Sequence, residues 1–158
     1  MTSLAEIQKY WNANNIPQIW YSKKKPLSLP WFNELSKMRF GIYYPYLNHD
    51  AEFQDHYGED ILEIGCGAGT DSVEFAKYGA NVTAVDLGED QVAMTKLNMC
   101  LHDIESPNVF QADAENLPFP DNTFDYVYSF GVLHHTDKTF YIINYIIYMP
   151  DKYSNDLP

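Results

Sequence analysis

The second half of the chain repeats two kinds of hydrophobic pattern in turn. Short runs of apolar and β-branched residues, typical of buried strands, alternate with longer segments whose apolar residues recur at helical spacing. Strands are predicted over residues 60–65, 81–87, 108–112 and 124–131, and helices over residues 70–78 and 89–103. Strands separated by helices indicate βαβ units and a parallel sheet, so the predicted fold class is α/β.

The first part of the chain is rich in aromatic residues and is interrupted by prolines. Its pattern predicts helices over residues 3–12 and 30–40. We therefore divide the chain into an N-terminal aromatic-rich helical segment, residues 1–57, and an α/β domain, residues 58–158. Two roles are open for the aromatic residues of the first segment. They either form a lid that faces a substrate, or simply cover the sheet and its helices. The lid candidates are Trp11, Trp20, Tyr21, Tyr44 and Tyr46.

Composition and charge narrow the class of protein. The 158 residues are 46% hydrophobic and 20% charged, as expected for one soluble globular domain. The net charge of −12 lies almost entirely in residues 61–158. So negative a surface disfavours nucleic acid as a partner.

Cysteine usage and the apolar runs bear on compartment and metal binding. Cys66 and Cys100 have neither the spacing of a disulfide framework nor that of metal ligands, which favours a reducing cytoplasm and no metal. The N-terminus lacks the pattern of a signal peptide. The longest apolar run, residues 140–149, is about half the length of a membrane span. We expect a cytoplasmic protein that does not bind a membrane.

The segment between the first predicted strand and helix is a glycine-rich turn. Glycines at positions 65, 67 and 69 let the backbone turn tightly and let a ligand approach without meeting a Cβ atom. The dinucleotide spacing G-x-G-x-x-G is not met, because position 70 is threonine. This spacing disfavours a nicotinamide dehydrogenase.

An acidic residue, Asp86, ends the second predicted strand, 17 residues after Gly69. A carboxylate at this position can accept hydrogen bonds from both hydroxyls of a ribose. The alternative is that Asp86 caps the helix that follows.

Two later segments complete a series of motifs. Residues 61–70, 82–87, 113–119 and 124–136 resemble, in this order, the motifs of class I S-adenosylmethionine-dependent methyltransferases, closest to the small-molecule "type 11" kind. The resemblance covers about residues 58–137. It implies a Rossmann-like three-layer sandwich with a mostly parallel sheet, S-adenosylmethionine as the cofactor, and methyl transfer to a small-molecule acceptor.

The resemblance also implies which residues bind the cofactor. Glu63, Gly65 and Gly67 would line its methionine moiety, and the backbone of Cys66 would contribute there. The third glycine, Gly69, belongs to the same group of cofactor-binding residues.

Contacts to the adenosine are implied at the ends of the second and third strands. Asp86 would hold both ribose hydroxyls, and Leu87 would pack on the adenine. Asp113 would accept a hydrogen bond from the adenine amino group, and the backbone amide of Ala114 would meet a ring nitrogen.

The segment after the fourth strand holds the remaining candidates. By the resemblance, Ser129 and Phe130 would lie beside the cofactor. His134 and His135 follow, where an acceptor would enter, and they are the candidates for a catalytic base. Adjacent residues of an extended segment point to opposite sides, so at most one of them faces the pocket. The alternative is one structural and one solvated histidine.

The end of the chain departs from the family pattern. The family continues with a helix, a glycine-containing turn and a fifth strand, whereas residues 150–158 contain no glycine and no strand pattern. We expect a sheet truncated after its fourth strand, whose open edge favours a homo-oligomer or a partner chain. Because the family's remaining part usually supplies some of the acceptor pocket, the alternative function is a non-catalytic S-adenosylmethionine-binding module or a regulatory or assembly subunit.

Overall fold

A computed structural model describes residues 4–13, 23–105, 107–133 and 136. The helices are α1 (Leu4–Ala13), α2 (Leu29–Met38), α3 (Leu47–Asp50), α4 (Thr70–Lys77) and α5 (Glu89–Leu101). A π-helical turn, Arg39–Tyr43, continues α2, and a 3-10 turn, Phe53–Asp55, follows α3. The strands are β1 (Asp60–Ile64), β2 (Asn81–Asp86), β3 (Asn108–Gln111) and β4 (Tyr126–Tyr128).

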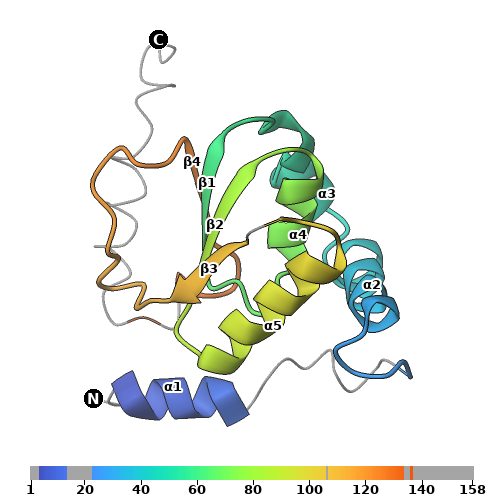
Figure 1. The fold of residues 1–158 in the computed structure, drawn as a ribbon, viewed down its shortest axis with the longest axis horizontal. Helices are drawn as coiled ribbons and strands as arrows, with labels where there is room; N and C mark the ends of the chain where they lie inside the picture. The colour runs from blue at the N-terminus through green and yellow to red at the C-terminus, as the bar shows by residue number, and fades with distance from the viewer. Residues whose placement is uncertain (1–3, 14–22, 106, 134–135, 137–158) are drawn as a thin grey trace.

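The four strands form one parallel sheet in the order β3-β2-β1-β4. In the centre of the sheet Ile61 pairs with Val82 on one side and with Tyr126 on the other. Within the described residues, β3 and β4 are therefore the outer strands. The predicted Rossmann-like α/β class is confirmed, and so is the helical nature of the N-terminal segment (Figure 1).

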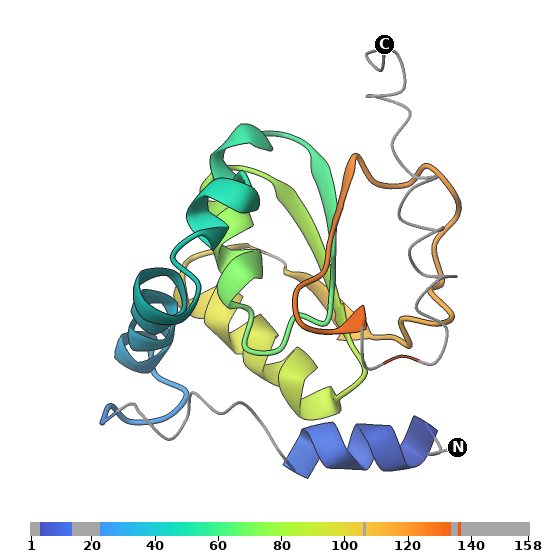
Figure 2. The same ribbon diagram turned by 180° about the vertical axis from the view of Figure 1, so that it is seen from behind.

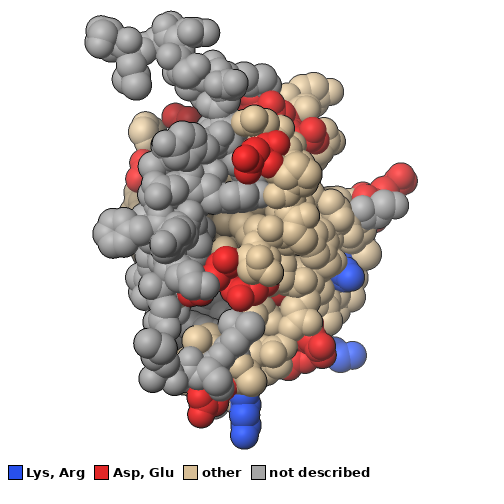
Figure 3. All heavy atoms as spheres, turned by 90° about the vertical axis from the view of Figure 1, so that its left-hand side faces the viewer, with Lys and Arg blue, Asp and Glu red and all other residues tan. Residues whose placement is uncertain are grey.

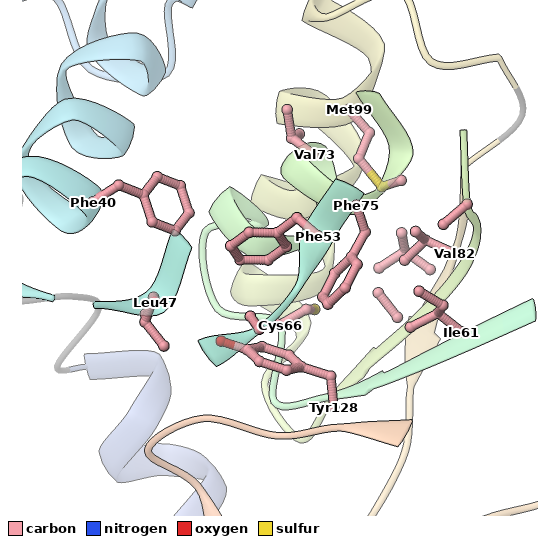
Figure 4. Close-up of a cluster of buried hydrophobic side chains, with 14 of the residues drawn as sticks. Phe40, Leu47, Phe53, Ile61, Cys66, Val73, Phe75, Val82, Met99 and Tyr128 are labelled. Carbon is pink, nitrogen blue, oxygen red and sulfur yellow. The ribbon is translucent and has the colours of Figure 1, made fainter. Parts of the chain in front are cut away.

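Helices α4 and α5 cover one face of the sheet, and α2 packs on their outer side (Figures 1 and 2). The strands bury their apolar side chains against Phe75 and Met99 of these helices. Phe40, Leu47 and Phe53, all N-terminal to the sheet, belong to the same buried cluster (Figure 4). These N-terminal apolar residues thus contribute to the core of the α/β fold.

The opposite face of the sheet buries Leu62, Ile64 and Val85. In the described part of the chain it is covered by the segment that connects β3 to β4, which runs on the far side of the sheet from the helices (Figure 2). Phe119 and Phe124 meet there edge to face, with ring centroids 4.9 Å apart.

Several element ends differ from the predicted ones. Strand β4 spans Tyr126–Tyr128 and not 124–131, because Phe124 leaves the sheet plane to pack on its far face and the chain turns at Gly131, where φ is 76°. The short helix α3 was not predicted. Gly79, with φ 90°, ends α4 as expected of a helix-terminal glycine. The apolar run 140–149 lies outside the described residues.

Helix length and surface charge complete the description of the fold. No helix in the described ranges has the length and apolar character needed to cross a membrane. Acidic side chains are spread over the described part of the face in Figure 3, while basic ones are few and lie near its lower and right-hand edges.

Candidate ligand site at the carboxyl edge of the sheet

The glycine-rich turn leaves the end of β1 and folds over the end of β2. The backbone N–H groups of Gly65 and Cys66 both donate to the carbonyl oxygen of Val85, at 2.8 and 3.1 Å. Gly65, Gly67 and Gly69 have φ values of 84°, 55° and 70°, a region that side chains rarely adopt. The turn therefore requires glycine at all three positions.

The space around the three glycines differs. A Cβ atom on Gly65 would lie 2.1 Å from Cγ2 of Val132, and one on Gly69 would lie 2.8 Å from Cγ2 of Thr95. A Cβ atom on Gly67 would meet nothing within 4 Å. Gly65 and Gly69 thus allow close packing within the protein, whereas Gly67 borders open space that a ligand can use.

Helix α5 supports the turn from behind through polar side chains. Thr95 donates its hydroxyl to the carbonyl oxygen of Gly67 at 3.1 Å, and Asn98 donates its amide to that of Ala68 at 2.8 Å. Both side chains are buried. The turn is therefore held in shape by the protein itself.

Replacing Gly69 with alanine is expected to destabilise the fold more than replacing Gly58. Gly58 has a similar φ of 75°, but a Cβ atom there meets nothing within 4 Å. The backbone strain is thus matched, and the clash with Thr95 adds about 1–3 kcal/mol. Urea unfolding of both variants measures the difference in the free energy of unfolding. Equal losses of stability would show that α5 does not pack tightly against the turn. Thr95→Ser should partly rescue Gly69→Ala, since it removes the nearest methyl group.

Asp86 lies at the end of β2, beside the turn. Its Oδ2 accepts the N–H of Gly67 at 2.9 Å, and its Oδ1 accepts the N–H of Gly88 at 3.0 Å. Burial raises the pKa of Asp86, although these backbone hydrogen bonds oppose the rise. Gly88 occupies the N-cap position of α5, so Asp86 is not the helix cap. Each carboxylate oxygen still has a lone pair for a further donor.

The end of β3 brings Asp113 to the same edge of the sheet. The N–H of Ala112 donates to the carbonyl oxygen of Asp86 at 3.0 Å, which continues the pairing of the two strands. Asp113 accepts the N–H of Glu115 at 2.9 Å. The next residue, Ala114, is half-buried, and so is Leu87, which directly follows β2.

The end of β4 brings Ser129 and Phe130 to this edge. Ser129 donates to the carbonyl oxygen of Ile64 at 3.0 Å, so the segment lies against the start of the turn. The ring of Phe130 lies 4.9 Å from that of Tyr44, whereas Tyr46 is half exposed. Five of the predicted residues have side chains outside the described part: Trp11, Trp20, Tyr21, His134 and His135.

Behind the turn lies a buried polar cluster in which Glu63 is the only residue that was predicted for the site. Both oxygens of Asp71 accept hydrogen bonds from Arg39, and Oδ2 also accepts the hydroxyl of Tyr128 at 2.8 Å. Glu63, only 3% exposed, accepts the hydroxyl of Ser72. A sequence signal was present, since Arg39 is the only arginine of the chain.

The cluster places Glu63 away from open solvent. Its burial, together with the nearby charge of Asp71, raises the pKa of Glu63 to about 8. Burial also raises the pKa of the Cys66 thiol, and that of Tyr128 is raised by burial and by Asp71. Among the described residues, no three histidine, cysteine or acidic side chains gather as a metal ion would need.

Fold and site together define a Rossmann-like α/β domain with a glycine-rich turn and acidic residues at its carboxyl edge. A family model described as "Methyltransferase domain" matches residues 62–144, more than half of the chain. The chain belongs to this family.

Individual relatives match over part of the chain. The 27-O-demethylrifamycin SV methyltransferase of Amycolatopsis mediterranei is 34% identical over 88 residues, which are 54% of this chain and 32% of that protein. The fatty-acid O-methyltransferase of Mycolicibacterium smegmatis is 33% identical over 112 residues, 68% of this chain and 38% of that protein. The chain thus spans about a third of the length of these curated relatives.

The fold is shared with solved structures. A methyltransferase from Aquifex aeolicus, described as SAM-dependent, superposes with a TM-score of 0.62 at 21% identity. The match covers 80% of this chain and 68% of that one. At 21% sequence identity this similarity shows a shared fold only.

Proposed function

We propose that the chain binds S-adenosylmethionine at the carboxyl edge of its sheet and takes part in methyl transfer to a small-molecule acceptor. The observation that carries the proposal is the open space at Gly67, directly beside the carboxylate of Asp86. Parallel α/β sheets bind their ligands at this edge, where loops from neighbouring strands meet.

The residues present fit this cofactor better than a phosphate-bearing one. Asp86 accepts the N–H of Gly67, a group that would otherwise be free for an anion, and Glu63 lies behind the same turn. The carboxylate of Asp86, so placed, repels a pyrophosphate but accepts hydroxyl groups and attracts a cation. S-adenosylmethionine carries ribose hydroxyls and a positively charged sulfonium, and it has no phosphate.

In this proposal the acidic strand ends would hold the adenosine. Asp86 would take the ribose hydroxyls through its remaining lone pairs, and Leu87, Asp113 and Ala114 would take the adenine. The turn at Gly65, Cys66, Gly67 and Gly69, with Glu63 behind it, would take the methionine part. These roles rest on the family resemblance and on the meeting of the strand ends at one edge.

When bound, the cofactor supplies a methyl group activated by its sulfonium. The protein would then contribute alignment and the exclusion of water, because methyl transfer is an in-line displacement. Ser129 and Phe130 lie where they would border the cofactor, and Tyr44 packs on Phe130. His134 and His135 stay our candidates for a catalytic base, of which at most one would face the pocket.

The acceptor class, assembly and compartment belong to the same proposal. The names of two relatives specify acceptors that are small organic molecules, a demethylrifamycin and a fatty acid. The acidic surface favours such an acceptor over nucleic acid. We also propose self-association or a partner chain at the outer strand β4, and a cytoplasmic location that suits the free thiols of Cys66 and Cys100.

The proposal is tested by calorimetric titration of the chain with S-adenosylhomocysteine. We expect a dissociation constant in the micromolar range, about −8 kcal/mol. Gly67→Ala places a methyl group in the open space and should weaken binding at least about tenfold. Gly58→Ala is the matched control, since it has the same kind of backbone and open surroundings at the other end of β1. Absence of binding by the folded wild-type chain would contradict the proposal.

A further inference from the structure

Arg39 links three separate parts of the fold. It stands where α2 passes into the π-helical turn, and its side chain is 14% exposed. Its guanidinium donates to both oxygens of Asp71, which lies in the first turn of α4. Tyr128, the last residue of β4, donates to the same carboxylate at 2.8 Å. The N-terminal segment, α4 and β4 thus converge on one buried ion pair.

The same guanidinium lies on two aromatic rings at the edge of the site. Its Cζ atom is 4.9 Å from the ring centre of Phe130 and 5.5 Å from that of Tyr44. The two rings pack on each other at 69°. Asp71 fixes the orientation of the planar guanidinium, and the guanidinium in turn orients both rings.

Stability alone does not account for this arrangement. Burying an ion pair costs as much desolvation energy as the attraction returns, and apolar residues often serve as well in its place. The pair nevertheless joins two residues 32 positions apart, and its guanidinium also contacts the rings of Phe130 and Tyr44. Its distinctive contribution is orientation, which lysine cannot reproduce because it lacks the planar fork.

We propose that Arg39 is a positioning residue that holds Phe130 and Tyr44 as one wall of the cofactor site and so makes the N-terminal segment part of that site. This inference rests on the proposed function, since Phe130 matters to a ligand only if the cofactor binds at this edge. Arg39 acts through the two rings.

The test compares variants that alter the guanidinium in different ways. Arg39→Lys keeps the charge and loses the fork. The double variant Arg39→Met with Asp71→Asn loses the ion pair without leaving a buried charge unpaired, so it keeps the test possible if the lysine variant does not fold. Val82→Ala is the control, because Val82 is buried near the amino end of β2, at the edge of the sheet opposite the glycine turn. Thermal unfolding and the affinity for S-adenosylhomocysteine are measured for each.

We expect both Arg39 variants to bind S-adenosylhomocysteine about tenfold more weakly, whereas Val82→Ala lowers the melting temperature and keeps the affinity. Phe130→Leu should lower the affinity much less in the Arg39→Lys background than in the wild type, because both substitutions disrupt the same contact between the guanidinium and the ring. Wild-type affinity in both Arg39 variants would overturn the role proposed for Arg39. Losses of affinity that are additive between Arg39→Lys and Phe130→Leu would do the same, and neither result would touch the proposed function. Failure of the folded wild-type chain to bind would overturn the proposed function and this inference together.

Discussion

Replacing Asp86 with alanine is expected to weaken the binding of S-adenosylhomocysteine at least about 100-fold, because two charge-assisted hydrogen bonds of about 1.5–3 kcal/mol each are lost. The carboxylate is held in place by the N–H groups of Gly67 and Gly88, so it reaches a ligand without reorganising. Asp86→Asn keeps one acceptor oxygen and should lose less affinity than Asp86→Ala. Calorimetric titration at constant pH measures all three proteins.

A matched control separates this local effect from the general loss of negative charge. Asp121→Ala removes an exposed carboxylate from the turn before β4 and should leave the affinity unchanged. The far-ultraviolet circular dichroism of both variants should match the wild type. If Asp86→Ala still binds within about threefold of the wild type, the ligand does not use this carboxylate.

The features that sequence predicted best are those determined by local chemistry. Short apolar runs predict the strands, and the positive φ at Gly67 and Gly79 is what glycine at a tight turn or helix end implies. Once the strands are parallel, their carboxyl ends must meet, so Asp86 and Asp113 are neighbours by topology alone. The acidic edge of the site could therefore be predicted.

The support behind the glycine turn could not be predicted in this way. A hydrophobic pattern assigns polar positions of α5 to solvent, yet Thr95 and Asn98 are buried because the turn presents unpaired carbonyl groups to them. The turn precedes them by nearly thirty residues. Arg39 and Asp71 are similarly remote, and nothing in a local pattern pairs them.

Glu63 is expected to make the stability of the chain fall as the pH rises from about 4.5 to about 8. Its pKa is raised from 4.5 to about 8, first by burial and then by the charge of Asp71, while the hydroxyl of Ser72 and the cation of Arg39 oppose the rise. Between these two values the folded chain keeps a proton that the unfolded chain releases. The free energy of unfolding therefore declines through this window, by a few kcal/mol in order of magnitude, and levels off above about pH 8.

The matched variant for this prediction is Glu63→Gln. Glutamine has nearly the same shape and can still accept the hydroxyl of Ser72, but it cannot ionise. The variant should be less sensitive to pH in this window and more stable than the wild type at pH 8.5. Because all other titrating groups are shared, the difference between the two urea-unfolding profiles isolates Glu63. Parallel profiles would mean that Glu63 titrates normally and that its carboxylate reaches water, in which case it would stand open to a ligand rather than behind the turn.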